Sequence, residues 1–377
     1  MFGLCNNLSN INILKNWTVS NGTDFSQFLY SCKIISDIKP LENWDISNGI
    51  NFKWMFKNCE MLSDIKPLEK WNVSKGKLFE EIFDHCHLIS NIKPLEKWDV
   101  SNAINLNGIF SELGKLTDIT PIQNWNVSKC RDLSYLFFLC KSLSDISPIR
   151  NWNISKCKNL SYSFAFTKIS DITPIQNWNV ENVISFNSLF NGCKISNIMP
   201  LEKWNVSKGE DFYGMFSACE KLSNIKPLEY WNVSKGQKFG NLFSDCKNLS
   251  DLNPLKHWNV SNGTEFSGMF YNCKLISDIT PLGKWDVSKG IEFSRMFSNL
   301  ELLKDVKPLE NWNVSNGVNF SYMFYDCRLS DLQPLQFWNV SKGKNFKSMF
   351  LKCSAINENL LEKWKFAKKS YFKSMFK

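Results

Sequence analysis

The tryptophans of this chain recur at a nearly constant interval, and no other feature limits its fold so strongly. Successive tryptophans of this series stand 27 residues apart, or 26 in four cases, and only Trp54 lies outside it. The series is Trp17, Trp44, Trp71, Trp98, Trp125, Trp152, Trp178, Trp204, Trp231, Trp258, Trp285, Trp312, Trp338 and Trp364. Ordinary globular domains do not produce this spacing, whereas a period of about 20–50 residues is typical of stacked repeats.

Each repeat contains two different hydrophobic patterns, which the segment 258–284 shows clearly. Phe266, Met269 and Phe270 have the i, i+3, i+4 spacing of one face of a short helix. The polar residues before them carry turn and N-cap chemistry. The segment 276–279 is short and β-compatible, and Pro281 then ends pairing because it has no N–H to donate. We therefore predict a short strand, a turn, a short helix and a return loop in each repeat.

One such repeat cannot bury both its helix face and its strand, so neighbouring repeats must stack. We predict an α/β repeat solenoid, with a parallel sheet on the concave face and short helices on the convex face. Residues 1–377 form a single solenoid of about fourteen repeats of 26–27 residues, with partial repeats at both ends. At the spacing of paired strands, this ladder is on the order of 65 Å long.

The repeat resembles a known family. The segment Asn313-Val314-Ser315-Asn316-Gly317, with Met323-Phe324, Cys327 and 329–332 after it, is similar to the BspA-like leucine-rich repeats. More narrowly, it resembles the Mycoplasma-type repeat of surface proteins, which is also common in giant viruses and protists. The resemblance covers essentially the whole chain and implies a leucine-rich-repeat-like right-handed superhelix. Bacterial members are often surface adhesins.

The charge of the chain says little in favour of a nucleic-acid partner. The net charge is +9, but nearly all of the positive charge is lysine, with arginine only at positions 131, 150, 295 and 328. Nucleic-acid binders usually need arginine for bidentate contacts. No stretch approaches the roughly 18 apolar residues of a membrane span, and the first residues do not resemble a signal peptide. We expect a cytoplasmic or virion setting, with surface exposure only if a signal or anchor lies outside this chain.

Most cysteines share one column of the repeat, which indicates packing. Eleven of the thirteen are Cys5, Cys32, Cys59, Cys86, Cys140, Cys193, Cys219, Cys246, Cys273, Cys327 and Cys353. Elsewhere the column holds Leu113, Thr167 or Leu300, as a buried packing position would. Cys130 and Cys157 instead share the usual glycine column of adjacent repeats; a disulfide between them is an alternative to two thiols.

No set of residues with catalytic or metal-binding spacing interrupts the repeat. The run Asp84-His85-Cys86-His87 has the residue types of a metal site, but Cys86 belongs to the core column and only His257 is found elsewhere. Histidine is too scarce for a conventional triad, and no phosphate-binding glycine loop is present. We therefore expect no metal, no cofactor and no enzymatic activity.

Two polar ladders are the candidate binding residues. The first, seven residues before each tryptophan, is always Asp or Asn, and the second lies two residues further on. If the isoleucine column faces the core, both ladders point the other way, onto the concave sheet. The alternative for the first ladder is capping of turn backbone. The candidates are Asp37, Asp64, Asp118, Asp145, Asp171, Asp251, Asp278, Asp305, Asp331, Lys39, Lys66, Lys93, Thr120, Thr173 and Lys226.

A third column, four residues after each tryptophan, is rich in lysine and predicts a basic stripe. Its lysines are Lys75, Lys129, Lys156, Lys208, Lys235, Lys289, Lys342 and Lys368. The stripe is interpreted either as a solvated edge that keeps the solenoid soluble or as a surface for an acidic partner.

The function that these patterns favour is a non-catalytic protein-interaction scaffold that binds an unknown protein partner through the repeat surface. The alternative is a surface adhesin or a virion structural component. Because the sequence starts and stops inside a repeat, its ends would also allow head-to-tail self-association.

Overall fold

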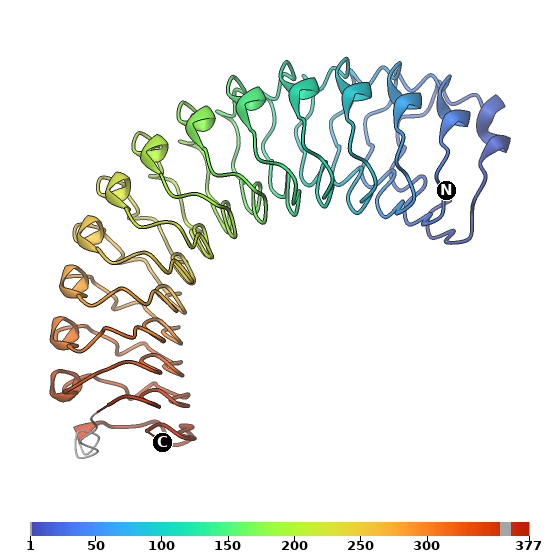
Figure 1. Cartoon of the computed structure of the whole chain (residues 1–377). Helices are drawn as coiled ribbons and strands as arrows, with labels where there is room; N and C mark the ends of the chain where they lie inside the picture. Colours follow the sequence, from blue (N-terminus) through green and yellow to red (C-terminus); the bar gives the residue numbers. More distant parts are fainter. Residues whose placement is uncertain (1, 355–362, 377) are drawn as a thin grey trace. The chain divides into compact units, whose positions relative to one another are not determined.

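The structure is a computed structural model that describes residues 2–354 and 363–376. By its internal contacts the chain divides into two compact halves, residues 1–183 and 184–377. Within each half, the backbone runs as a series of similar coils, each with a short helix at one edge and tight turns at the other (Figure 1). Both halves are therefore repeat solenoids, as predicted. That residues 1–377 form one continuous, right-handed and curved solenoid stays a prediction.

The helices of the described residues are all short 3₁₀-helices. They are η1 (Asn12–Asn16), η2 (Lys39–Leu41), η3 (Lys66–Leu68), η4 (Lys93–Leu95), η5 (Thr120–Ile122), η6 (Ser147–Ile149), η7 (Thr173–Ile175), η8 (Met199–Leu201), η9 (Lys226–Leu228), η10 (Asn253–Leu255), η11 (Thr280–Leu282), η12 (Lys307–Leu309) and η13 (Gln333–Leu335). We call the edge that they form the helix edge.

Proline explains why a helix begins at this place in the repeat. In η11, Pro281 occupies the second helical position, where a missing N–H costs nothing and the fixed φ favours a helix. The N–H of Leu282 donates to the carbonyl of Ile279, and the N–H of Trp285 donates to Leu282, each at 3.0 Å. These i→i+3 bonds close one tight turn and bring the tryptophan into the core.

The pairing between repeats lies in the Phe-x-x-Met-Phe segment, not in the isoleucine segment. Isolated parallel bridges join one residue of each repeat to its counterpart in the next repeat. This residue directly precedes the first residue of the Phe-x-x-Met-Phe segment, as Glu265 does, and Glu265 pairs with Glu292. In the N-terminal half they run through Asp24, Asn51, Leu78, Asn105, Asp132 and Asn159, and in the C-terminal half through Ser185, Asp211, Lys238, Glu265, Glu292, Asn319, Asn345 and Tyr371.

Beyond each bridge, the chain makes two consecutive turns that stack on those of the next repeat. The N–H groups of Phe266, Gly268, Phe270 and Asn272 donate to carbonyls 26 residues further on, at 2.7–3.0 Å. The third residue of each turn has a positive φ, such as 57° at Gly268 and 60° at Asn272. We call this edge, built from residues 266–273 and their counterparts, the turn edge.

The predicted places of helix and strand within the repeat are therefore both wrong. Residues 266–272 form turns and residues 276–279 form no strand, and the described part of the chain contains neither an α-helix nor a continuous strand. In each of the two tandem turns, the first and fourth side chains point into the core. These are Phe266 and Met269 in the first turn and Phe270 and Cys273 in the second, and their spacing resembles that of one face of a helix. Glycine is rare at the positive-φ positions, so the usual turn signal is missing as well.

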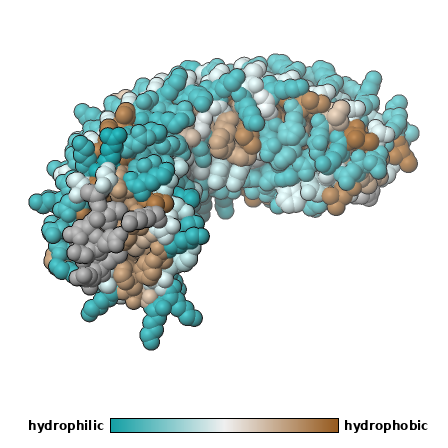
Figure 2. Space-filling view, turned by 60° about the horizontal axis from the view of Figure 1, so that its bottom comes forward, coloured by the Kyte–Doolittle hydropathy of each residue, from teal (hydrophilic) through white to brown (hydrophobic). Residues whose placement is uncertain are grey.

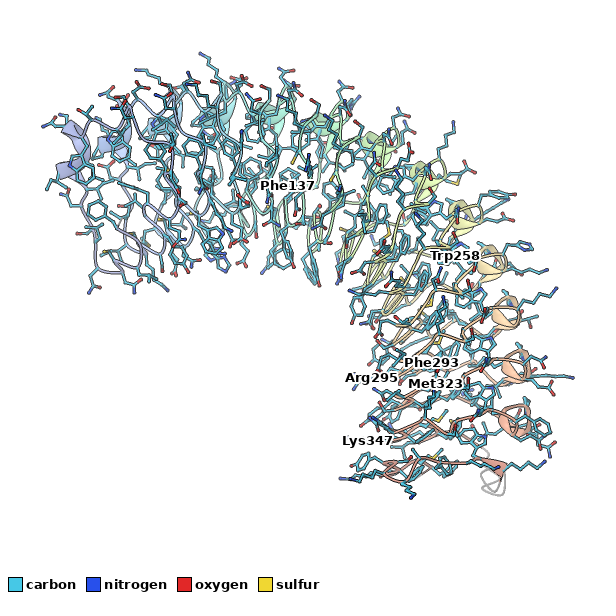
Figure 3. The ribbon with its side chains drawn as sticks, turned by 180° about the vertical axis from the view of Figure 1, so that it is seen from behind. Phe137, Trp258, Phe293, Arg295, Met323 and Lys347 are labelled. Carbon is cyan, nitrogen blue, oxygen red and sulfur yellow. The ribbon has the colours of Figure 1, made fainter. Side chains whose placement is uncertain are left out.

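The core is formed by the tryptophan, phenylalanine, leucine and isoleucine columns. The indole N–H of Trp258 donates to the carbonyl of Leu228 in the preceding repeat at 2.9 Å. Phe293 stacks between Phe266 and Phe320, with ring centroids 5.6 and 5.5 Å away. Figure 3 shows Trp258 and Phe293 inside the coils, with Arg295 and Lys347 at the turn edge. Each repeat therefore completes the core of its neighbour.

The cysteine column is a ladder of buried thiols, and the structure holds all thirteen cysteines as free thiols, Cys130 and Cys157 included. The Cys273 thiol donates to the carbonyl of Phe243, one repeat earlier, at 3.0 Å. Burial raises the pKa of this thiol far above its usual value. Only Cys5 is exposed, and Cys353 is half-buried.

We expect a thiol reagent at pH 8 to modify Cys5 rapidly in the native protein and the buried thiols only after unfolding in denaturant. Burial excludes the reagent, and the raised pKa leaves almost no thiolate. Counting reactive thiols spectrophotometrically before and after denaturation checks this, and Cys5→Ser should remove the fast phase. Several rapidly reacting thiols in native Cys5→Ser would contradict the buried ladder.

Candidate functional site

The predicted Asp/Asn ladder lies on the helix edge and caps the 3₁₀-helices. In every case the side-chain oxygen accepts a hydrogen bond from the backbone N–H two residues later, as Asp278 does from Thr280 at 2.8 Å. The same bond is made by Asn10, Asp37, Asp64, Asn91, Asp118, Asp145, Asp171, Asn197, Asn224, Asp251, Asp305 and Asp331. Hydrogen bonds from Thr120 and Thr173 lower the pKa of Asp118 and Asp171.

The residues of the second predicted ladder stand at the beginning of the same helices. Lys39, Lys66, Lys93, Thr120, Thr173 and Lys226 are each the first residue of a 3₁₀-helix. Both ladders therefore lie beside helices and not on a sheet, which corrects the predicted placement. The error has a physical reason: the isoleucine column does face the core, but its flanking residues belong to a capped turn and not to a strand. Ligand binding by these residues stays a prediction.

Shallow grooves separate successive helices along this edge. Between η6 and η7, a groove of about 360 Å³ is lined in part by Asp145, Ser147, Asp171 and Thr173. A similar groove of about 440 Å³ lies between η9 and η10. Predicted ladder residues thus border surface depressions between these two pairs of helices, and the two linings differ, with Arg150 at the first groove and Glu229 at the second.

The lysine column joins neighbouring repeats. The ammonium group of Lys129 donates to the side-chain oxygen of Asn102 at 2.6 Å, and the amide of Asn102 donates to the carbonyl of Ser74 at 2.8 Å. Lys75, Lys289 and Lys342 make the same bond to an asparagine of the preceding repeat. These lysines form inter-repeat contacts at an exposed surface.

The turn edge differs from repeat to repeat in its chemistry. Its positive-φ positions carry residues as different as Trp54, Glu81, Tyr135, Ser188 and Arg295. L-residues other than Gly and Asn rarely adopt this conformation. Because the stacked backbone bonds impose the conformation, the side chains at these positions vary from repeat to repeat.

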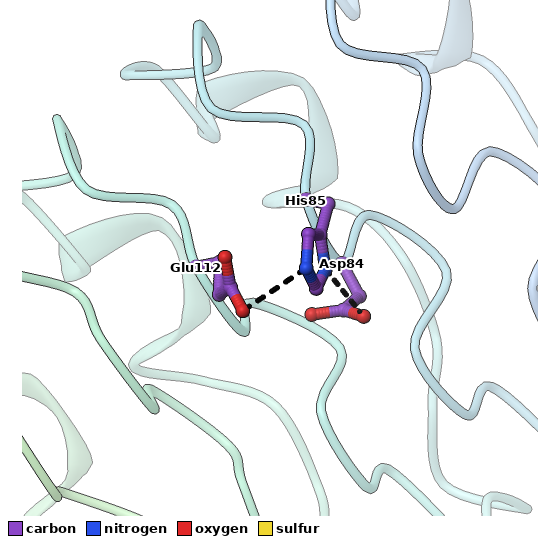
Figure 4. Close-up of side chains that lie close together, drawn as sticks. All are labelled: Asp84, His85 and Glu112. Atoms are coloured by element: carbon purple, nitrogen blue, oxygen red, sulfur yellow. Dashed lines mark ion pairs between the residues drawn. The ribbon is translucent and has the colours of Figure 1, made fainter. Parts of the chain in front are cut away.

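One part of the turn edge gathers charged groups from three repeats. His85 lies between two carboxylates: its Nδ1 is 2.9 Å from Asp84 Oδ2 and its Nε2 is 3.1 Å from Glu112 Oε1 (Figure 4). The ammonium group of Lys57 lies 2.9 Å from the same Asp84 oxygen and also pairs with Glu81. We call Asp84, His85 and Glu112 the Asp–His–Glu cluster.

This cluster is partly withdrawn from water. Asp84 is only 4 % exposed. Burial alone would lower the pKa of Lys57, but hydrogen bonds to Glu81 and Asp84 outweigh it, so that this pKa lies above its usual value. A surface pocket of about 220 Å³ opens onto the cluster and is lined on its far side by Tyr135 and Phe138.

Aromatic side chains continue the same edge. Tyr135 and Tyr162 stack with ring centroids 4.8 Å apart and planes 10° from parallel. Phe138 packs edge-on against Tyr162 at 5.8 Å and against Phe166 at 6.0 Å. Tyr135 is 37 % exposed and Phe166 is 40 % exposed. We call Tyr135, Phe138, Tyr162 and Phe166 the aromatic platform.

Sequence reasoning missed this site although a signal was present. His85 and Glu112 are 27 residues apart, as are Tyr135 and Tyr162, so each pair shares a column. Within the run from Asp84 to His87, Cys86 points into the core, so the run by itself does not indicate a site. A comparison of the same turn position in successive repeats pairs His85 with Glu112 and so indicates that the two side chains are neighbours.

A comparison with protein families shows which family matches this chain. The family described as "Mycoplasma protein of unknown function, DUF285" matches residues 1–116, 79–194, 161–280 and 276–377. The chain belongs to this family. The predicted kinship with the Mycoplasma-type, BspA-like repeats is confirmed.

Solved structures similar to this DUF285 protein are leucine-rich-repeat proteins. An internalin from Listeria monocytogenes aligns with a TM-score of 0.47 and 18% identity, covering 89% of this chain and 84% of its own. The functional domain of InlJ from the same organism, described as including a cysteine ladder, aligns with a TM-score of 0.23 and 11% identity (89% and 69% coverage). A Leptospira interrogans leucine-rich-repeat protein aligns with a TM-score of 0.22 and 12% identity (81% and 82%). Such low TM-scores support no conclusion about function.

No curated protein sequence matches the DUF285 chain significantly. Among the described residues, no helix has the length and apolar character needed to cross a membrane.

Proposed function

We propose that this protein is a non-catalytic protein-interaction scaffold, and that its contact surface is the turn edge between Trp54 and Phe166. The observation that carries the proposal is the exposed, stacked aromatic platform beside the Asp–His–Glu cluster. In the repeats on either side of the platform, the column of Tyr135 and Tyr162 holds Gly108 and Ser188. A repeat protein of this type needs one distinctive surface to select a partner, and this is the most distinctive one in the N-terminal half.

The chemistry of the site fits a protein partner. Aromatic residues in a partly buried setting contribute most of the binding energy at many interfaces, because they bury a large area at a low entropic cost. The carboxylates of Glu81, Asp84 and Glu112 exceed the single ammonium group of Lys57, so the cluster favours a cationic group on the partner. A lysine or arginine side chain would contact the carboxylates and the face of Tyr135 together.

The grooves of the helix edge support this role less well. Their aspartates are already engaged in capping bonds, and replacing such a cap costs about 1 kcal/mol of helix stability. The cap therefore explains the Asp/Asn ladder without a ligand, whereas packing within a repeat does not explain the exposed stack of Tyr135 on Tyr162.

A comparison of variants in affinity capture tests the proposal. We expect Tyr135→Ser/Tyr162→Ser to lose the partner that the unaltered chain captures, by about tenfold or more, since interface aromatics contribute about 2 kcal/mol or more each. Serine occupies the same column with a positive φ at Ser188 and Ser348, so the backbone tolerates it. Tyr230→Ser is the matched control, because Tyr230 is 81 % exposed in the other half.

The rival surface is tested in the same experiment. The triple variant Asp145→Ala/Ser147→Ala/Asp171→Ala removes the polar ladder around η6 and η7 and should leave capture unchanged. Loss of the partner with this triple variant, together with full capture by the double tyrosine variant, would move the contact surface to the helix edge. The proposal covers a scaffold inside a cell as well as a surface adhesin or a virion component, since the contact chemistry is the same.

A further inference from the structure

We propose that Asp84, His85 and Glu112 form a binding site for a divalent transition-metal ion, with Zn²⁺ as the best-fitting probe. This inference does not depend on the partner surface proposed above. It concerns the same edge of the N-terminal half but a different chemistry, and it is tested by metal binding alone.

The first argument is the number of protons available. A neutral imidazole has one N–H and one lone pair, so it can donate to one carboxylate only. Here a carboxylate oxygen faces each ring nitrogen, at 2.9 and 3.1 Å. A second positive charge beside the ring, carried by a proton or by a metal ion, makes both contacts favourable.

The second argument is the state of His85 Nδ1. This atom is buried and has no hydrogen-bond partner, although Asp84 Oδ2 lies 2.9 Å away. The distance is short but the direction does not suit a hydrogen bond. A nitrogen lone pair and a carboxylate oxygen that are close without a hydrogen bond are arranged as two ligands of one ion would be.

The third argument is the size and composition of the cluster. One ligand atom from each of Asp84, His85 and Glu112 lies within 4.8 Å of the others. Bonds of about 2.0–2.2 Å at tetrahedral angles place ligand atoms of Zn²⁺ about 3.3–3.6 Å apart, so the most distant pair would have to approach by up to about 1.5 Å. One imidazole and two carboxylates are ligands that Zn²⁺ accepts, whereas Mg²⁺ prefers oxygen alone. Water would complete the coordination from the open pocket.

The ammonium group of Lys57 occupies part of the space that the metal ion would fill. This group lies 2.9 Å from Asp84 Oδ2 and would have to release this oxygen to the metal while keeping Glu81. Lys57 is thus a competing cation, and its removal should strengthen metal binding. A bound ion would join the repeat of His85 to the repeat of Glu112.

Isothermal titration of the untagged full-length chain with ZnCl₂ tests the site, in a Cys5→Ser background that removes the exposed thiol. We expect one Zn²⁺ per chain, a raised melting temperature on addition of the metal, and no binding of Mg²⁺. His85→Asn and Glu112→Gln should each weaken binding by about tenfold or more, and Lys57→Gln should tighten it. Asparagine already occupies the His85 column at Asn58 and Asn272, so His85→Asn keeps the backbone conformation.

His257→Asn is the matched control, because His257 is exposed and lies far along the chain from the cluster. Its Zn²⁺ affinity should equal that of the unaltered chain. The proposal is overturned if no Zn²⁺ binds, or if His85→Asn and Glu112→Gln both bind as tightly as the control. If either variant fails to fold, the affinity of the other and the gain in Lys57→Gln decide the outcome.

Discussion

Replacing Trp258 with alanine is expected to lower the free energy of unfolding by about 3–5 kcal/mol, the range for removal of a large buried aromatic side chain. The side chain is only 4 % exposed. It packs against Phe239, with ring centroids 6.3 Å apart. Its indole N–H also bonds to the carbonyl of Leu228, which after truncation keeps only the bond from the Trp231 N–H, so one inter-repeat hydrogen bond is lost.

Urea unfolding monitored by circular dichroism measures this effect, and hydrogen exchange locates it. Because each repeat contacts only its neighbours, loss of protection should concentrate between residues 228 and 285. Trp54→Asn is the matched control, since Trp54 lies outside the tryptophan series and is half-buried on the turn edge. Its free energy of unfolding should change by no more than about 1 kcal/mol. Equal losses for both variants would show that the tryptophan series is not the core.

A second large effect is expected where glycine lies under a phenylalanine ring. A Cβ atom on Gly290 would lie 2.2 Å from Phe293 Cζ and 2.9 Å from the carbonyl oxygen of Val287. The backbone of Gly290 is not left-handed, so the close ring and not the conformation requires glycine here. Gly290→Ala should therefore lower the free energy of unfolding by about 1–3 kcal/mol through overpacking.

The chain itself contains the compensating change. Where the glycine column holds Ala103, the phenylalanine column holds Leu106, and the cysteines of this column are likewise followed by leucine, at Leu133 and Leu160. Val183, followed by Phe186, and Lys369, followed by Phe372, are exceptions. Leucine lacks the ring atom that the new Cβ would meet, so the smaller side chain makes room.

A double-mutant cycle measures this coupling. We expect Gly290→Ala/Phe293→Leu to lose less stability than the sum of the two single variants, by about 1 kcal/mol or more. The rescue should be partial, because the carbonyl of Val287 stays close. Strict additivity of the two changes in urea unfolding would mean that the ring does not require the glycine.

The core was predictable because each core column repeats in chemistry. Trp258, Phe266, Met269, Phe270 and Cys273 all lie inside, as their recurrence indicated. Their local structure was not predictable, since an i, i+3, i+4 pattern arises equally from a helix and from two tandem turns. Only the backbone bonds from one repeat to the next distinguish the two, and these join residues 26 positions apart.

The candidate site, too, was predictable only in part. The sequence drew attention to Asp84, His85 and the Asp/Asn ladder as polar groups near turns. It left open whether Asp278 and its counterparts cap turns or bind a ligand, and the structure shows the capping bonds. The sequence did not show that Glu112 and Tyr135 meet His85 around one pocket.

By itself, the sequence determined the period, the inward columns and the family, because these depend on which residues recur. The tertiary structure alone decided which edge varies in chemistry from repeat to repeat. Stacked backbone bonds impose a positive φ on residues such as Glu81, Glu112 and Tyr135, and a sequence contains no local signal for a conformation that its neighbours impose. The distinctive surface of this protein therefore exists only once the repeats have stacked.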